Sequence, residues 1–293
     1  METRRLGRTN HLSTLVIMGT AAFWEIDQEG ANAALDLAQS YGVNHIDVAP
    51  QYGNAQRVLG EWLAAEPGRR ANFFIGCKTL ERSRDAAWVD LENSFKLLHT
   101  DHLELYQLHA ITTQEELDAA LAPGGAIETL VEARAQGLVD YLGLTGHGLQ
   151  APALQLQALQ RFDFDTLMVP IYPALYAIAQ YRRDIAALLA EAQARDVGIM
   201  AIKSAARGSW PAGVKTHQTW YQPYTTYPEV ERGVRFALSQ PGVTAIPSVG
   251  DVRILPLVLK AAENFRPMTP EEQEAAIAAT AGETPIFTEA QAE

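Results

Sequence analysis

The sequence has a single cysteine and no long apolar run. Cys77 has no partner within the chain, so a disulfide is excluded and a reducing compartment is natural. The longest apolar run, residues 15–24, is shorter than the ~20 residues that a membrane helix needs. The N-terminus also lacks the apolar region of a signal peptide. We therefore expect a cytoplasmic protein with Cys77 packed in its core.

Positive charge is also scarce, since 23 Lys and Arg face 35 Asp and Glu, for a net charge of −12. An acidic surface repels phosphate backbones, so we expect no nucleic acid and no membrane among the partners. Four motifs are missing as well: G-x-G-x-x-G after a strand, the P-loop, H-E-x-x-H and G-x-S-x-G. Their absence disfavours a Rossmann dinucleotide site, an NTPase, a zinc protease and a serine hydrolase of that type.

Short apolar runs recur along the chain and alternate with amphipathic stretches. Runs of six or seven apolar residues suit strands that are buried on both faces, and the intervening stretches have helical periodicity. One helical face is expected to carry Ala31, Ala34, Leu35 and Ala38, and another to carry Ala87, Val89, Leu91, Phe95 and Leu98. Eight strands, each with room for a helix after it, predict a (β/α)8 TIM barrel. The runs start at residues 15, 44, 73, 103, 141, 166, 198 and 243.

No Pro/Ser/Gly-rich linker divides the chain, so we predict a single domain over residues 1–293. We expect an N-terminal β-hairpin before the barrel and a C-terminal helix that starts at Thr269 and Pro270, followed by a flexible tail over 282–293. Residues 204–228 form the one long irregular insertion, which is typical of a lid or substrate loop.

Polar side chains follow three neighbouring strands of the predicted barrel. Asp47 and Tyr52 follow the second strand, Lys78 ends the third and His109 ends the fourth. Because reactive residues of such barrels lie at the carboxyl ends of the strands, we expect these four side chains to converge. A lysine beside a tyrosine lowers the phenol pKa from its usual value of ~10, and the carboxylate keeps the lysine charged. A neutral imidazole can orient a substrate carbonyl, and a reduction would need a cofactor to supply hydride.

These residues occur in segments that together resemble the aldo-keto reductase family. The segments are RRLGRTN, HIDVAPQYGN, the lysine of FFIGCKT, TDHLELYQLH and AIPS. The resemblance implies a (β/α)8 barrel that uses NADPH more readily than NADH to reduce an aldehyde or ketone, such as a sugar or aromatic carbonyl. It also implies that Tyr52 is the general acid, that Lys78 and Asp47 tune its pKa, and that His109 orients the carbonyl.

The same resemblance assigns residues to the cofactor and the substrate. At the family's cofactor positions this chain has Gly19, Thr20, Asp47, Thr145, Met168, Lys203, Ser204, Ser248, Gly250 and Arg253. Arg253 is the obvious cation for the adenosine 2′-phosphate. Substrate contacts are expected from Trp24, Tyr52, His109, Trp220 and Tyr221.

Several alternatives stay open. His99 and His102 have a metal-like spacing, but a zinc site needs three or four convergent ligands, and we predict no metal and place His102 at the opposite end of the barrel. His147 suits a cofactor contact or a loop equally well, and the lid aromatics suit a substrate wall or an oligomer contact. An oligomer is neither predicted nor excluded. The runner-up function is a nicotinamide-binding regulatory or partner subunit with little turnover, and a third is a hydrolase or isomerase that uses Asp47 and His109.

Overall fold

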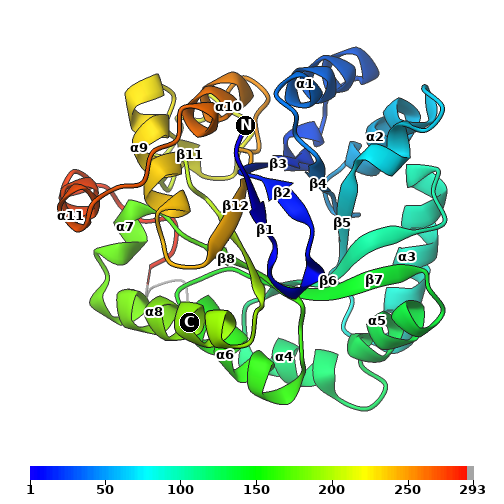
Figure 1. Cartoon of the computed structure of the whole chain (residues 1–293). Coiled ribbons are helices and arrows are strands. Elements are labelled where there is room, and N and C mark those ends of the chain that lie inside the picture. The colour runs from blue at the N-terminus through cyan, green and yellow to red at the C-terminus, as the bar shows by residue number, and fades with distance from the viewer. Residues whose placement is uncertain (289–293) are drawn as a thin grey trace.

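Eight parallel strands close into a barrel in the computed structural model, which describes residues 1–288 (Figure 1). Each predicted apolar run contributes one strand, so the predicted (β/α)8 fold is confirmed. The ring closes where the last strand pairs with the first, with Ile246 opposite Val16. In ring order the strands are β3 (Val16–Gly19), β4 (His45–Asp47), β5 (Phe74–Thr79), β6 (Leu103–Ile111), β7 (Val139–Gly146), β8 (Thr166–Pro170), β9 (Gly198–Ile202) and β12 (Val243–Pro247).

Helices surround the barrel and cover the outer faces of its strands (Figure 1). They are α1 (Gln28–Ser40), α2 (Ala55–Ala64), α3 (Arg84–Leu98), α4 (Gln114–Leu121), α5 (Ala126–Ala135), α6 (Ala151–Arg161), α7 (Pro173–Tyr176), α8 (Ala179–Ala194), α9 (Tyr227–Leu238), α10 (Leu255–Glu263) and α11 (Pro270–Ala278). No helix within residues 1–288 combines the length and the apolar character that crossing a bilayer requires.

The helical faces follow from the spacing of small and apolar residues. In α1 the predicted inner face of Ala31, Ala34, Leu35 and Ala38 is buried. In α3 the prediction for Val89 is wrong, because this side chain is 55% exposed. The buried residues of α3 are spaced three or four apart, and Val89 lies two residues from its nearest buried neighbours, on the far side of the helix.

The predicted N-terminal hairpin closes one end of the barrel. Its strands β1 (Thr3–Arg5) and β2 (Leu12–Thr14) pair antiparallel around the short helix η1 (Gly7–Thr9). Leu6 is fully buried against side chains of the barrel interior. Gly7 has φ +49°, and a Cβ there would lie 2.2 Å from the amide nitrogen of Gly198, so only glycine fits this close approach. The amino-terminal end of the barrel is therefore plugged.

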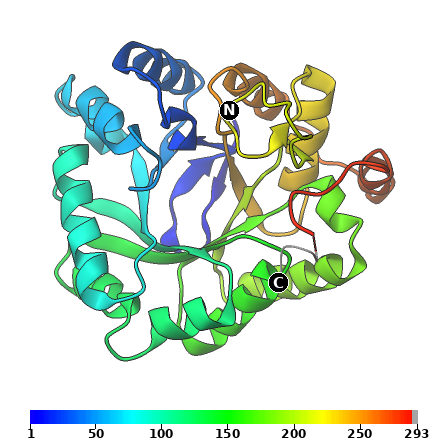
Figure 2. The ribbon, with the colours of Figure 1, turned by 180° about the vertical axis from the view of Figure 1, so that it is seen from behind.

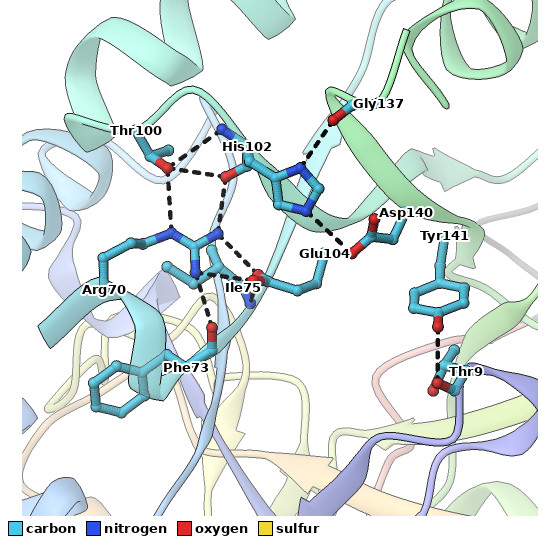
Figure 3. Close-up of polar contacts among 10 residues, drawn as sticks. All are labelled: Thr9, Arg70, Phe73, Ile75, Thr100, His102, Glu104, Gly137, Asp140 and Tyr141. Atoms are coloured by element: carbon cyan, nitrogen blue, oxygen red, sulfur yellow. Dashed lines mark hydrogen bonds and ion pairs between the residues drawn. The ribbon is translucent and has the colours of Figure 1, made fainter. Parts of the chain in front are cut away.

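A hydrogen-bond network around Arg70 and His102 joins the beginnings of β6 and β7 at this plugged end (Figure 3). The Arg70 guanidinium donates to both carboxylate oxygens of Glu104, at 3.0 and 2.9 Å, and to the carbonyl of His102 at 2.8 Å. The His102 ring lies 3.1 Å from the carbonyl oxygen of Gly137 and 3.0 Å from the Asp140 carboxylate, near the start of β7. His102 therefore lies at the end of the barrel that the sequence predicted, in a structural network.

The segment 204–228 is more ordered than the sequence predicted. Two short strands, β10 (Ala206–Gly208) and β11 (Gln222–Pro223), pair antiparallel within it. Its last two residues belong to helix α9, which begins at Tyr227 and has Pro228 in its first turn. Proline is pre-organised for the first turn of a helix, so the irregular loop ends earlier than predicted. We call residues 204–226 the lid.

The C-terminal region agrees with the prediction only in part. Helix α11 begins as predicted, with a capping box between Thr269 and Glu272. The flexible tail predicted from residue 282 is wrong for 282–288, because Ile286 and Phe287 are buried there. The backbone N–H of Ile286 also donates to the Tyr172 hydroxyl at 2.9 Å, which holds this segment on the barrel. Figure 2 shows this segment in red, running back from α11 across the molecule. Residues 289–293 of the predicted tail lie outside the described residues.

Candidate active site

A cavity of about 610 Å³ opens at the carboxyl ends of the barrel strands, opposite the plugged end. This volume is typical of small-molecule sites. Most of the predicted site residues line it, namely Gly19, Trp24, Asp47, Tyr52, His109, Thr145, Met168, Lys203, Trp220, Tyr221, Ser248 and Gly250. Four predicted residues do not line it, namely Thr20, Lys78, Ser204 and Arg253. The structure therefore brings residues from all parts of the chain to one cavity.

Lys78 lies behind the cavity wall and joins Asp47 to Tyr52. Its Nζ lies 2.5 Å from Oδ1 of Asp47 and 3.2 Å from the phenol oxygen of Tyr52. It also donates to the carbonyl of Val48 at 3.3 Å. The Lys78 side chain has no exposed area and that of Asp47 only 5%. Although burial lowers the pKa of Lys78, the attractions of Asp47 and Tyr52 hold it above its ordinary value, so this lysine stays charged.

The predicted lowering of the Tyr52 pKa is wrong for the protein without ligands. Burial raises the pKa of Tyr52 to about 12, although the Lys78 ammonium opposes this rise. The Asp47 carboxylate offsets part of the lysine's effect, because a negative charge nearby disfavours phenolate. Tyr52 is therefore fully protonated at neutral pH and holds a proton that it could donate.

His109 lies beside Tyr52 in the cavity wall. The two ring centroids are 5.7 Å apart and the rings are nearly perpendicular. Burial and the Lys78 charge hold the pKa of His109 well below its ordinary value, so the imidazole is neutral. Its Nδ1 lies 3.3 Å from the side-chain oxygen Oε1 of Gln51, a partner that the sequence did not predict. Oε1 can only accept a hydrogen bond, so in this arrangement Nδ1 carries the proton. With the Gln51 amide flipped, its NH2 group donates to Nδ1, and Nε2 then carries the proton and can donate to a substrate oxygen.

Thr145 holds the backbone beside His109 in an uncommon conformation. Ala110 has φ +52°, in the left-handed region that non-glycine residues rarely adopt. Its N–H donates to the Thr145 hydroxyl at 2.7 Å. A strained backbone conformation of this kind persists where several neighbouring contacts hold it in place, and such conformations are frequent at functional sites. Thr145, which was expected to hold a cofactor, therefore also fixes the end of the strand that carries His109.

Residues after the first strand likewise bond to their neighbours. The N–H of Gly19 donates to the Ser248 hydroxyl at 3.0 Å, and the Thr20 hydroxyl donates to the carbonyl of Asp47 at 2.8 Å. A Cβ at Gly19 would lie 2.9 Å from the carbonyl oxygen of Ser248. Gly19 thus leaves a wall of bare backbone on the cavity, whereas Thr20 positions Asp47 from outside it.

Arg253 is already engaged in an ion pair. Its guanidinium donates to both oxygens of the Asp251 carboxylate, at 2.9 and 2.7 Å, and to the carbonyl of Thr216 at 2.9 Å. Asp251 also accepts from the N–H of Gln218 at 3.0 Å. These bonds tie the lid to the segment after β12. The sequence did not predict this pairing, because nothing in the local pattern brings residues 216–218 to Arg253.

Trp220 and Tyr221 of the lid form an aromatic wall of the cavity, and Phe287 of the C-terminal segment packs against Trp220. Trp220 lies 6.4 Å from His147 and 5.9 Å from Phe287, measured between ring centroids. Tyr221 packs against Trp220 at 5.5 Å. Trp210 and Tyr224 of the lid do not line the cavity, and neither does Tyr227 of α9. The sequence missed Phe287 because the tail was expected to be flexible.

Within residues 1–288, no group of three or more His, Cys, Asp or Glu side chains is placed to hold a metal ion. Cys77 is buried, with its sulfur 3.6 Å from the Ser94 hydroxyl oxygen, in the core position that the sequence predicted.

The model of the aldo/keto reductase family matches residues 15–224, which include most of the cavity wall. The chain belongs to the aldo/keto reductase family. It is 32% identical over 164 residues to the uncharacterized oxidoreductase YrpG of Bacillus subtilis, an alignment that covers 49% of this chain and 48% of YrpG. The chain thus spans about half the length of this relative.

Solved structures of aldo-keto reductases share the fold. The holo form of an enzyme from Bacillus halodurans superposes with a TM-score of 0.73 at 18% identity, over 100% of both chains. A Klebsiella pneumoniae enzyme, solved in complex with NADPH, has a TM-score of 0.70 at 20% identity, over 95% of both chains. At these identities the likeness concerns the architecture, and the chemistry of this chain has to be argued from its own residues.

Proposed function

We propose that this chain reduces an aldehyde or ketone to the alcohol with a nicotinamide cofactor, or oxidises the alcohol in the reverse direction. The observation that carries the proposal is the contact of Tyr52 with the buried Lys78–Asp47 pair, beside a neutral His109 on the same cavity wall. A protonated phenol and an imidazole facing one cavity suit proton transfer to an oxygen atom. No group in this set is a source of electrons, so the reaction needs a redox cofactor.

Each residue has a defined part in this reaction. His109 donates a hydrogen bond to the carbonyl oxygen and holds it near the phenol of Tyr52. Tyr52 donates its proton to that oxygen as negative charge develops there, and the Lys78 ammonium at 3.2 Å stabilises the phenolate that remains. Asp47 keeps the ammonium charged inside the barrel, where an isolated charge would be unfavourable.

NADPH is the proposed cofactor, as it is in the Klebsiella pneumoniae complex. When bound, it supplies the hydride for the carbonyl carbon. The residues present fit it, because Gly19 leaves bare backbone on the cavity wall. The Ser204 hydroxyl does not line the cavity, but it is buried and has no hydrogen-bond partner among residues 1–288. We keep Gly19, Asp47, Thr145, Met168, Ser204, Ser248 and Gly250 as proposed cofactor contacts. Thr20 acts through Asp47, and Arg253 reaches a phosphate only by leaving Asp251.

We also propose a cytoplasmic location for the protein.

The decisive experiment measures NADPH oxidation with a panel of aldehydes and keto sugars, after titration of NADPH and NADH by quenching of tryptophan fluorescence. Carbonyl-dependent oxidation of bound NADPH supports the reductase. Tight NADPH binding without even a single turnover on any carbonyl would support the regulatory subunit instead. Conversion of a substrate with no nicotinamide present would support the hydrolase or isomerase.

A further inference from the structure

Lys203 follows β9 and directs its ammonium into the cavity. Its backbone has φ +70°, so the strand end is held in a conformation that L-residues rarely adopt. Nζ lies 4.7 Å from the ring centroid of Trp220 and 4.8 Å from that of Tyr221. Two aromatic rings therefore hold this cation in the wall of the cavity, across from the first strands of the barrel.

This ammonium has no anionic partner within the part of the chain that the structure describes. Among residues 1–288, no carboxylate oxygen lies within 4.0 Å of Lys203 Nζ. The nearest buried acid in the cavity, Asp47, is already paired with Lys78 at 2.5 Å. Burial, together with the charge of Lys78, lowers the pKa of Lys203 to about 7, although the Asp47 carboxylate opposes this change. An anion bound beside a buried, unpaired lysine would interact with it more strongly than with an exposed lysine.

A second polar group lies beside it. His147 contacts Trp220 and lies 6.5 Å from His109, measured between ring centroids, so a row of rings leads from Tyr52 to Lys203. Burial and the Lys203 charge lower the pKa of His147 to about 3, so this ring is neutral. Its buried Nδ1 has no hydrogen-bond partner within the described part of the chain. His147 and Lys203 thus both line the cavity and both contact Trp220.

We propose that Lys203 and His147 form a subsite for the carboxylate of the substrate, so that the chain acts on carbonyl compounds that also carry a carboxylate. The proposal rests on the proposed reductase function and specifies its substrate class. One cation beside a neutral hydrogen-bonding ring suits a single negative charge better than the two of a phosphate. The net charge of −12 repels anions at long range, so such a substrate requires a dedicated cation in the site.

The test compares two aldehydes of the same shape, 4-formylbenzoate and its neutral amide 4-formylbenzamide, with succinate semialdehyde and butanal as a flexible pair. The wild type is expected to prefer the carboxylate in kcat/KM. In Lys203→Met this preference falls about ten- to hundredfold, the range for a charged hydrogen bond. Lys203→Arg retains part of the preference. Lys215→Met, which removes an exposed lysine at the rim of the same cavity, retains all of it.

Two results would overturn the subsite. One is an unchanged preference in Lys203→Met for both pairs, and the other is an equal loss for charged and neutral aldehydes accompanied by weaker NADPH binding. The second result would show that Lys203 pairs with a phosphate of the cofactor. Calorimetric titration of 4-formylbenzoate separates the two proposals. If the wild type reduces neither aldehyde but Lys203→Met loses binding of 4-formylbenzoate and not of the amide, the subsite stands and the reductase fails.

Discussion

The ammonium of Lys78 lies 3.2 Å from the phenol oxygen of Tyr52 and also 4.8 Å from the centroid of its ring. Lys78 itself is fully buried, so water does not screen this interaction. Burial nevertheless raises the pKa of Tyr52 to about 12. The pair therefore holds a proton in the resting state and stabilises phenolate only when the proton leaves.

Replacing Tyr52 with phenylalanine is expected to lower kcat about 10²- to 10⁴-fold, the range for loss of a general acid. NADPH affinity, measured by tryptophan fluorescence, should change little. The matched control is Tyr141→Phe, which removes the same hydroxyl at the plugged end, where it donates to the carbonyl of Thr9 at 2.9 Å (Figure 3). This control should lose about 1 kcal/mol of stability and keep its activity. Full activity in Tyr52→Phe would remove Tyr52 from the mechanism.

Replacing Lys78 with methionine leaves the Asp47 carboxylate buried without its partner. We expect the free energy of unfolding to fall by about 3 to 5 kcal/mol, as is usual when one member of a buried ion pair is removed. Urea unfolding followed by circular dichroism measures this. The double variant Lys78→Met/Asp47→Asn should be more stable than Lys78→Met alone, because no unpaired charge remains. If the loss of unfolding free energy in the double variant equals the sum of the losses in the two single variants, the pair is not coupled.

His147 should make stability depend on pH. Its pKa of about 3 in the folded chain lies below the unfolded value of ~6.5. Between these two pH values the unfolded chain binds a proton at His147 and the folded chain does not. The contribution of the neutral His147 ring to the free energy of unfolding is complete above about pH 6.5 and is lost progressively as the pH falls toward 3. Urea midpoints at about pH 7.5 and about pH 5 should therefore differ less in His147→Gln than in the wild type. Equal differences in the two proteins would mean that His147 titrates normally when folded.

If the Arg253 guanidinium reaches the 2′-phosphate, Arg253→Ala is expected to weaken the binding of NADPH about three- to tenfold and to weaken the binding of NADH less. Asp251→Asn removes the carboxylate that now accepts from Arg253 and should strengthen NADPH binding relative to NADH. Fluorescence titration of both cofactors gives these ratios. An identical effect of Arg253→Ala on the two cofactors would show that Arg253 only ties the lid through Thr216.

The sequence predicted the barrel and the placement of its four chemical side chains for one physical reason. Strands buried on both faces are continuous apolar runs, and the first polar residue after each run marks a carboxyl end. Parallel strands in a ring bring those ends together, so Asp47, Tyr52, Lys78 and His109 could be expected at one cavity. Their spacing along the chain carried this information without any knowledge of distant contacts.

The tertiary structure decided what depends on packing between distant segments. The pKa of Tyr52 rises because residues far apart in the sequence exclude water from it, and this burial outweighs the neighbouring cation. Phe287 packs against Trp220 of the cavity wall because the C-terminal segment lies on the barrel, which no local pattern indicates. Among residues 1–288, Lys203 has no carboxylate partner, because the buried acid of the cavity, Asp47, is bound to Lys78. Local sequence determines elements and their ends, whereas desolvation and charge pairing are set by which segments meet in space.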